Sequence, residues 1–175
     1  MKKLILTAAL VALPFSANAG FMDASWAKQA CDAWNGSATL TNELGDYVFE
    51  NLPEWAPVEI PRTRGIWAPD ISYFNGLYHV YYSVSTFGRN NSAIGLATNV
   101  TLDQDSDDYK WIDHGMVVRS TSGEDDFNAI DANIAVEDED NVWLSWGSFW
   151  GGIKMRKIDP QTGMLSEKDT TLYSL

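Results

Sequence analysis

The stretch GIWAPDISYFNGLYHVYYSVSTFGRNNSAIGLATN, residues 65–99, has the alternation and turn residues of β-strands. Asn75-Gly76, the strongest two-residue hairpin signal, lies there between two runs of aromatic and β-branched residues. SAIGLATNV, residues 92–100, predicts a further strand, and KWIDHGMVV, residues 110–118, predicts a fourth after a polar loop. No part of this region has a helical hydrophobic period. The sequence therefore predicts an antiparallel β-sheet that begins near Ile71.

The same arrangement begins again 61 residues later, since 131 − 70 = 61. Asp70 is followed by a strand, the Asn75-Gly76 turn and a second strand. Asp131 is followed by ANIAVE, a turn at residues 138–141, the strand VWLSWGSF and a loop leading to GIKMRKID. Repeated units of four short strands are typical of β-propeller blades. The predicted fold class is therefore all-β, with two propeller blades.

Residues 1–19 have the parts of a secretory signal peptide. Lys2 and Lys3 form the charged region, LILTAALVALPF forms the apolar core, and Ala17-Asn18-Ala19 is a small-residue cleavage site. The apolar run is too short for a membrane span. We therefore expect a secreted or periplasmic protein that starts at Gly20 and has no membrane segment after cleavage.

The rest of the chain divides into two parts. Residues 20–60 are predicted to be an irregular segment that replaces or truncates a blade, and residues 61–175 are predicted to form a partial propeller. Within the first part, a short helix is predicted over residues 24–34. Residues 43–65 are predicted to be a loop, because their prolines exclude pairing in a central strand.

The composition excludes several classes of function. The net charge is −12, and without residues 1–19, which contain two lysines and no acidic residue, it becomes 10 − 24 = −14. Nucleic-acid binding needs clustered Lys and Arg, so no nucleic-acid partner is expected. The single Cys31 cannot form an internal disulfide. Eight tryptophans indicate either a β-rich core or a carbohydrate site, where flat rings stack on sugar C–H groups.

Three motifs resemble the endo-acting arabinanases of glycoside hydrolase family 43: the opening stretch, FNAIDANI and WLSWGSFWGGIKM. The resemblance extends from about Val48 to Lys157. Members of that family are five-bladed β-propellers that hydrolyse α-1,5-linked arabinan with inversion. The resemblance implies that this chain is a secreted glycosidase of the arabinan endo-1,5-α-L-arabinosidase type, and that it covers about two blades, the second and the third.

The resemblance gives Asp131, in NAID, a catalytic role. It matches the family's second carboxylate, which is neither acid nor base but raises the pKa of the general acid. A negative charge beside a carboxyl group disfavours its ionisation, so the acid stays protonated. From the residues alone, the alternative is an Asp that starts a strand and caps a turn. Asp70 is expected to tie the start of its strand to neighbouring backbone N–H groups.

The resemblance also implies contacts with sugar. Trp67 and Phe87 match aromatic residues that line the family's substrate groove. For Trp67 the alternative is packing between blades, and Pro69 is expected to hold Ala68 in an extended conformation that presents Trp67 at a rim. Four more residues complete the expected substrate-binding set: Asn128, Ser148, Phe149 and Trp150.

The chain departs from the family pattern in the acid and the base. The family's base is an Asp in a His-Asp-Pro motif, whereas neither His79 nor His114 is followed by Asp-Pro. The family's acid is a Glu of a later blade, and neither group is identifiable in this sequence. Ala132 also replaces the proline of NAIDP. Inverting hydrolysis needs both an acid and a base, so we expect a truncated or split form that does not act alone.

Two alternatives stay open: a non-catalytic arabinan-binding module, and a xylan-active member of the same family. The expected partners are plant cell-wall arabinan or arabino-oligosaccharides, with a complementary chain or self-association completing the ring. No cofactor is expected to be required and no metal ligands are predicted. The family's structural calcium relies on a later histidine that this sequence lacks.

Overall fold

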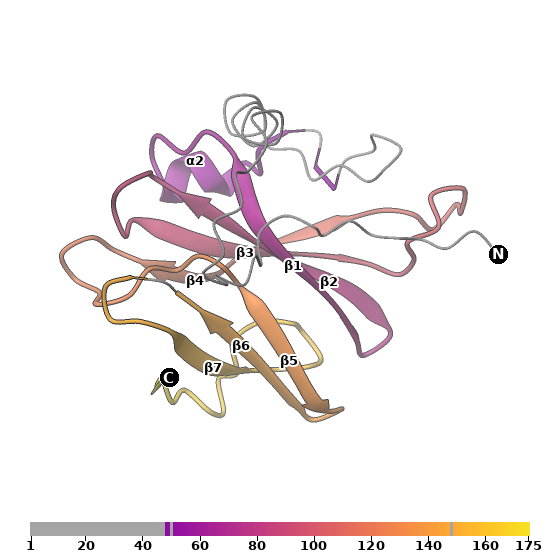
Figure 1. The fold of residues 1–175 in the computed structure, drawn as a ribbon. Helices are drawn as coiled ribbons and strands as arrows, with labels where there is room; N and C mark the ends of the chain where they lie inside the picture. Colours follow the sequence, from indigo (N-terminus) through magenta and orange to yellow (C-terminus); the bar gives the residue numbers. More distant parts are fainter. Residues whose placement is uncertain (1–47, 50, 148) are drawn as a thin grey trace, which may run out of the picture.

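Two four-stranded antiparallel sheets form most of the protein in the computed structural model (Figure 1). The structure describes residues 48–49, 51–147 and 149–175. The signal peptide predicted for residues 1–19 and the helix predicted for residues 24–34 lie outside the described residues. Over the described part of the chain, no helix has the length and apolar character needed to cross a membrane.

The first sheet contains β1 to β4 in sequence order. Its strands are β1 (Ile66–Phe74), β2 (Leu77–Ser85), β3 (Ser92–Asn99) and β4 (Ile112–Ser120). Phe74 pairs with Leu77, so the connection of β1 and β2 is the two-residue turn Asn75-Gly76. Both turn residues have positive φ, 47° and 75°. A tight hairpin turn of this kind requires positive φ at both central positions, and the hairpin predicted from the sequence is confirmed.

The second sheet repeats this order. Its strands are β5 (Asn133–Asp138), β6 (Asn141–Trp146), β7 (Lys154–Ile158) and β8 (Tyr173–Ser174). The turn predicted at residues 138–141 joins β5 to β6, and the Asp138 carboxylate accepts hydrogen bonds from the Asn141 amide at 2.8 Å. Each sheet is a meander of four strands, so the predicted repeat corresponds to two blades.

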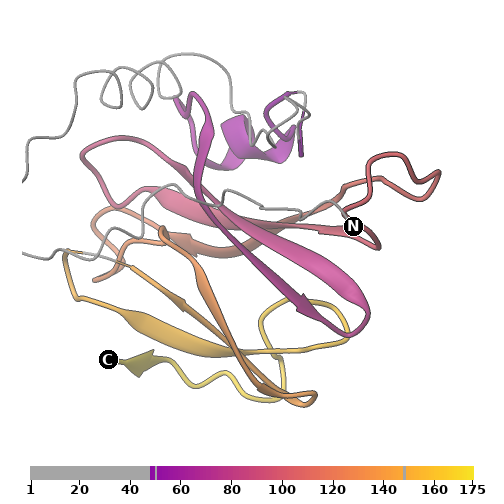
Figure 2. The ribbon, with the colours of Figure 1, turned by 45° about the vertical axis from the view of Figure 1, so that its right-hand side comes forward.

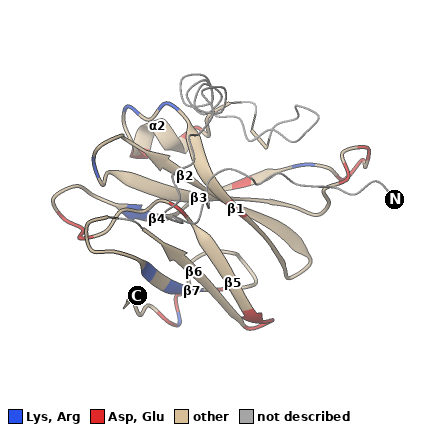
Figure 3. Ribbon diagram, viewed as in Figure 1, with Lys and Arg blue, Asp and Glu red and all other residues tan. Residues whose placement is uncertain are grey.

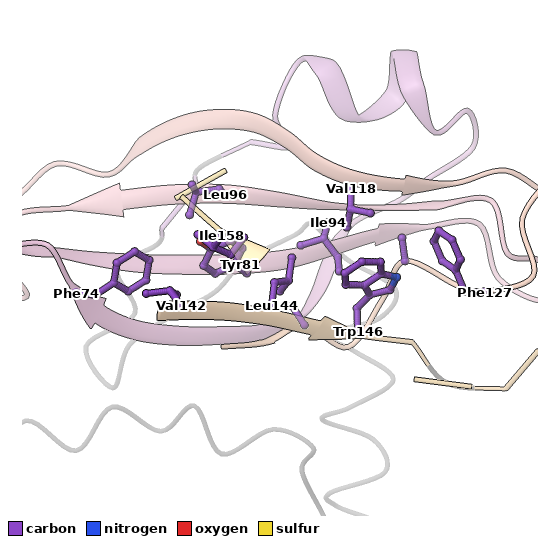
Figure 4. Packing of buried hydrophobic residues seen from close by; sticks show 12 residues of the cluster. Phe74, Tyr81, Ile94, Leu96, Val118, Phe127, Val142, Leu144, Trp146 and Ile158 are labelled. Carbon is purple, nitrogen blue, oxygen red and sulfur yellow. The ribbon is translucent and has the colours of Figure 1, made fainter. Parts of the chain in front are cut away.

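The main core fills the space between the two sheets (Figure 4). Tyr81 and Leu96 from the first sheet meet Leu144 and Trp146 from the second, and all four are almost fully buried. Burial of one large apolar side chain contributes about 1.5–3 kcal/mol. The two blades therefore share one core and hold each other in place.

The other face of the first sheet is covered by α2 (Trp55–Glu59) and the residues around it (Figures 1 and 2). Strand β2 is buried on both faces, because Tyr81 points into the main core while Tyr82 packs against this helix. The loop prediction for residues 43–65 is wrong at α2. Pro57 lies in the first turn of the helix, where a backbone N–H has no intrahelical partner and proline is tolerated.

Strand β1 starts at Ile66, earlier than the strand expected from Ile71. Trp67 pairs with Ser83 and Asp70 with Tyr81, which leaves one extra residue on β1 and makes a β-bulge. Ala68, in this bulge, has a φ of +43°. The expectation that Pro69 holds Ala68 extended is therefore wrong, since the bulge sets the backbone at this point.

Two polar contacts join the blades across the core. The Asp70 carboxylate accepts a hydrogen bond from the backbone N–H of Ile134 on β5, at 2.8 Å. The hydroxyl of Tyr81 donates to the carbonyl of Gly163 at 2.7 Å. The expectation that Asp70 binds backbone N–H groups is confirmed, and its N–H partner belongs to the neighbouring blade.

Candidate functional site

One edge of the two sheets gathers the predicted site residues that the structure describes. Because neighbouring strands run antiparallel, the starts of β1 and β5 and the ends of β2 and β6 lie on the same side. This side is the left-hand edge in Figure 1, where the connections from β2 to β3, from β4 to β5 and from β6 to β7 lie. The residues placed there are Trp67, Phe87, Asn128, Asp131, Phe149 and Trp150.

Asp131 lies in the connection between the blades and is held by the first of them. Its backbone N–H donates to the hydroxyl of Ser83 on β2 at 3.1 Å, and Ser83 is fully buried. Its φ is +55°, in the left-handed region that few residues other than glycine adopt. Such a conformation persists only where the surrounding structure enforces it, and it is common at functional sites.

The Asp131 side chain is exposed on one side. Within the described residues its carboxylate accepts no hydrogen bond and forms no ion pair, so it does not cap a turn there. The protein packed around the group removes part of its water and raises the pKa of the Asp131 carboxyl above its ordinary value. A carboxylate with a raised pKa and a free surface is a candidate for binding or catalysis.

The chain that leads to Asp131 is fixed by buried polar groups of the first blade. The Asn90 side chain donates to the carbonyls of Asp125 and Phe127 at 2.9 and 3.0 Å. The Ser120 hydroxyl accepts from the backbone N–H of Ala129 at 2.9 Å. Asn90 and Ser120 are 3% and 0% exposed. These bonds, together with that from Ser83, set the position of Asp131 from three different parts of the first blade.

Sequence reasoning did not assign these three supporting residues to the site. Small polar residues at strand ends are common, and no local pattern distinguishes those that bind a distant backbone. Of the three, Asn90 alone lies close in sequence to a predicted site residue, because it follows Phe87 in the loop after β2.

Exposed aromatic side chains lie in the connections at the same edge of the two sheets as Asp131. Phe87 and Phe149 are each 84% exposed, and Trp150 is 47% exposed. The rings of Phe149 and Trp150 meet edge to face, with centroids 5.6 Å apart. Trp67 is half-buried at the start of β1. Large apolar rings cost free energy in water, so several at one edge indicate a surface that binds a ligand.

Asn128 differs from the aromatic residues because it is buried, with 4% of its surface exposed. Its side-chain oxygen has no hydrogen-bond partner in the described part of the structure. Its backbone carbonyl accepts from the N–H of Ile130 at 3.0 Å, which shapes the turn before Asp131. Ser148 lies outside the described residues.

No group of three or more His, Cys, Asp or Glu side chains that could hold a metal ion occurs in the described ranges. Asp131 and Asp70 are the carboxyls at the inter-blade junction with raised pKa, and burial is the main cause for both.

The described residues form two propeller blades, with exposed rings and one carboxylate at a common edge. The sequence profile of Glycosyl hydrolases family 43 matches residues 40–174, and the chain belongs to this family. The resemblance found in the sequence motifs and the all-β propeller fold are thereby confirmed, and the family is one of glycosidases.

Characterised relatives share this region. An extracellular exo-alpha-(1->5)-L-arabinofuranosidase of Cellvibrio japonicus is 48% identical over 115 residues, which are 65% of this chain and 33% of that protein. An extracellular endo-alpha-(1->5)-L-arabinanase of Bacillus subtilis is 50% identical over 129 residues, which are 73% of this chain and 38% of that protein. The chain thus spans about a third of the length of these relatives.

Solved structures show the same fold. The alpha-L-arabinanase of Cellvibrio cellulosa in complex with arabinohexaose superposes with a TM-score of 0.70 at 43% identity, over 74% of this chain and 41% of that one. An endo-arabinanase of Bacillus licheniformis gives a TM-score of 0.66 at 44% identity, over 75% and 43% of the two chains.

Proposed function

We propose that this chain is part of a secreted, inverting arabinanase that hydrolyses α-1,5-linked arabinan, and that its edge site binds the polysaccharide. Two relatives whose names specify α-(1→5)-linked arabinose substrates share 48% and 50% of their aligned residues with it, which supports this substrate. Both are named extracellular, in agreement with the signal peptide expected at residues 1–19. Plant cell-wall arabinan and arabino-oligosaccharides are the proposed ligands.

The observation that carries the proposal is the environment of Asp131. Its carboxylate has a raised pKa, makes no hydrogen bond to the described residues and lies at the edge that carries Phe87, Phe149 and Trp150. Aromatic faces stack on the C–H groups of a sugar, while a carboxylate accepts hydrogen bonds from its hydroxyls. The edge can therefore hold a linear oligosaccharide against Asp131.

In the proposed reaction Asp131 acts by charge. Inverting glycosidases use a general acid that protonates the leaving oxygen and a general base that activates water. A neighbouring carboxylate raises the pKa of the acid and keeps it protonated. We propose this role for Asp131, with Trp67 and Asn128 shaping the site around it. The acid and the base are not assigned to residues of this chain, and a complementary chain is their proposed source.

The test combines hydrolysis and binding. Reducing-sugar release from debranched arabinan is measured with the parent and with Asp131→Asn, which keeps the shape and removes the charge. Asp140→Asn, in the exposed turn between β5 and β6, is the matched control. Where the parent releases sugar, we expect Asp131→Asn to lower release by about 100-fold or more, because the general acid loses the charge that keeps it protonated, and we expect the control to match the parent. Several protein concentrations reveal any dependence on self-association.

Calorimetric titration with arabinohexaose separates the alternatives. Binding without release at any concentration would favour the non-catalytic arabinan-binding module. Release from xylan in place of arabinan would favour the xylan-active relative. The proposal is wrong if the parent neither binds nor cleaves the arabinan substrates.

A further inference from the structure

A buried lysine lies beneath the loop that carries Phe149 and Trp150. Lys154, at the start of β7, is 4% exposed, and its ammonium donates to the Asp126 carboxylate at 3.2 Å and to the Ser174 hydroxyl at 3.1 Å. Lysine is almost never fully buried unless it is paired. Strand β7 carries two further basic residues, which Figure 3 shows in blue, and both are less buried than Lys154. Lys154 is therefore the basic residue of β7 whose burial depends on an ion pair.

Asp126, the partner of this lysine, touches the aromatic loop directly. The backbone N–H of Gly151 donates to the Asp126 carbonyl. A Cβ atom added at Gly151 would overlap that carbonyl and would lie 2.8 Å from the Asp126 carboxylate oxygen. The loop thus packs on Asp126 without space for a side chain. One face of Asp126 meets the loop, and its carboxylate meets Lys154.

The loop itself has a backbone that its own sequence does not favour. Phe149 and Trp150 have φ values of +23° and +48°, in a region that large side chains rarely adopt. The two ends of the loop are also close, since a Cβ atom at Gly147 would lie 2.6 Å from the carbonyl oxygen of Gly152. Contacts from outside the loop must hold such a conformation.

We propose that Lys154, acting through Asp126, is a positioning residue that holds the Phe149 and Trp150 rings in the orientation that binds the sugar chain. The lysine contacts neither ring and forms no part of the reacting groups; it fixes Asp126, and Asp126 fixes Gly151. The identity of the ligand, an arabino-oligosaccharide, rests on the proposed function. The order of the loop in the unbound protein does not depend on which ligand binds.

The test uses Lys154→Met, which keeps the apolar stem and removes the ammonium. The matched control is Lys157→Met on the same strand, because the Lys157 ammonium donates to Asn141 at 2.8 Å in the turn at the opposite edge. Hydrogen–deuterium exchange of the peptide over residues 147–153 reports the order of the loop without ligand. Calorimetric titration with arabinohexaose reports affinity, and urea unfolding reports global stability.

We expect Lys154→Met to speed exchange of the loop and to weaken arabinohexaose binding about five- to tenfold, because the rings must then be ordered at binding. Lys154→Arg should restore most of the affinity, and Lys157→Met should behave as the parent in both assays. If Lys154→Met does not fold, Asp126→Asn, in which the altered side chain is largely exposed, gives the same two readouts.

Unchanged loop exchange, or faster exchange with unchanged affinity, would overturn the positioning role. An equal loss of affinity in Lys157→Met would also overturn it, since the effect would then follow charge in general. If the parent binds no arabinohexaose, the proposed function fails, and the loop exchange of Lys154→Met still decides whether the ion pair orders the loop.

Discussion

Acid should loosen the junction between the two blades by protonating His79. This residue is 2% exposed on β2, its ring stacks on Phe74 with centroids 3.7 Å apart, and its Nδ1 is 3.1 Å from the Leu77 carbonyl. Burial lowers the pKa of His79 from 6.5 to about 4. Gly163 of the second blade packs against this ring so closely that an added Cβ atom would lie 2.9 Å from it.

The magnitude follows from the difference in proton binding between the folded and the unfolded chain. The unfolded chain binds a proton at His79 below pH 6.5, and the folded chain does so only below about pH 4. The stabilising effect of the neutral ring is thus complete above pH 6.5 and is lost as the pH falls from 6.5 to about 4. Lowering the pKa from 6.5 to about 4 corresponds to at most about 3 kcal/mol of stability, most of which is lost at pH 4.5.

The assay is urea unfolding at pH 7.5, 5.5 and 4.5 for the parent and for His79→Asn, whose amide can replace Nδ1 as a donor. The variant should be less stable at pH 7.5 because a cavity remains. Its deficit should shrink by about 2–3 kcal/mol at pH 4.5, since it has no buried imidazole to protonate. Parallel stability curves for the parent and His79→Asn would show that protonation of His79 does not cause the loss of stability in acid.

Two further substitutions test how the site is assembled. Asp70→Ala should lower the free energy of unfolding by about 1–3 kcal/mol, because the Ile134 N–H loses its acceptor. Asp70→Asn keeps an acceptor and should lower it less. Burial raises the Asp70 pKa, so the parent should lose stability as the pH rises above 3.8, and Asp70→Asn should lose less over the same range. Urea unfolding of both variants from pH 4 to 7 checks this, and equal losses would argue against the inter-blade bond. Asn90→Ala should lower the free energy of unfolding by about 1–3 kcal/mol and weaken arabinohexaose binding, because two carbonyls of the segment before Asp131 lose their donor. An affinity equal to that of the parent, measured by calorimetry, would show that this segment keeps its shape without Asn90.

The residue types and their order along the chain determine the strands and turns of the two blades. Asn75-Gly76 fixes the first hairpin, because only residues that tolerate positive φ fit its two turn positions. The alternation along β2 fixes which side chains face each side of the sheet. The repeat at 61 residues, 131 − 70, gives the second blade. The motifs around Asp131 also identify the family, since their residue types and spacing can be compared directly with known sequences.

The long-range contacts that position Asp131 and the loop of Phe149 and Trp150 are evident only in the tertiary structure. The Asp131 N–H donates to Ser83, which is 48 residues away in the sequence. The Lys154 ammonium donates to Asp126, which is 28 residues away. No local pattern predicts such bonds, because a buried polar side chain takes whichever partner the packed blades bring within reach. The positive φ at Ala68 arises in the same way, from the pairing of β1 with β2 across a bulge. Local propensities therefore define the strands, whereas contacts between distant segments define the edge on which the proposed site lies.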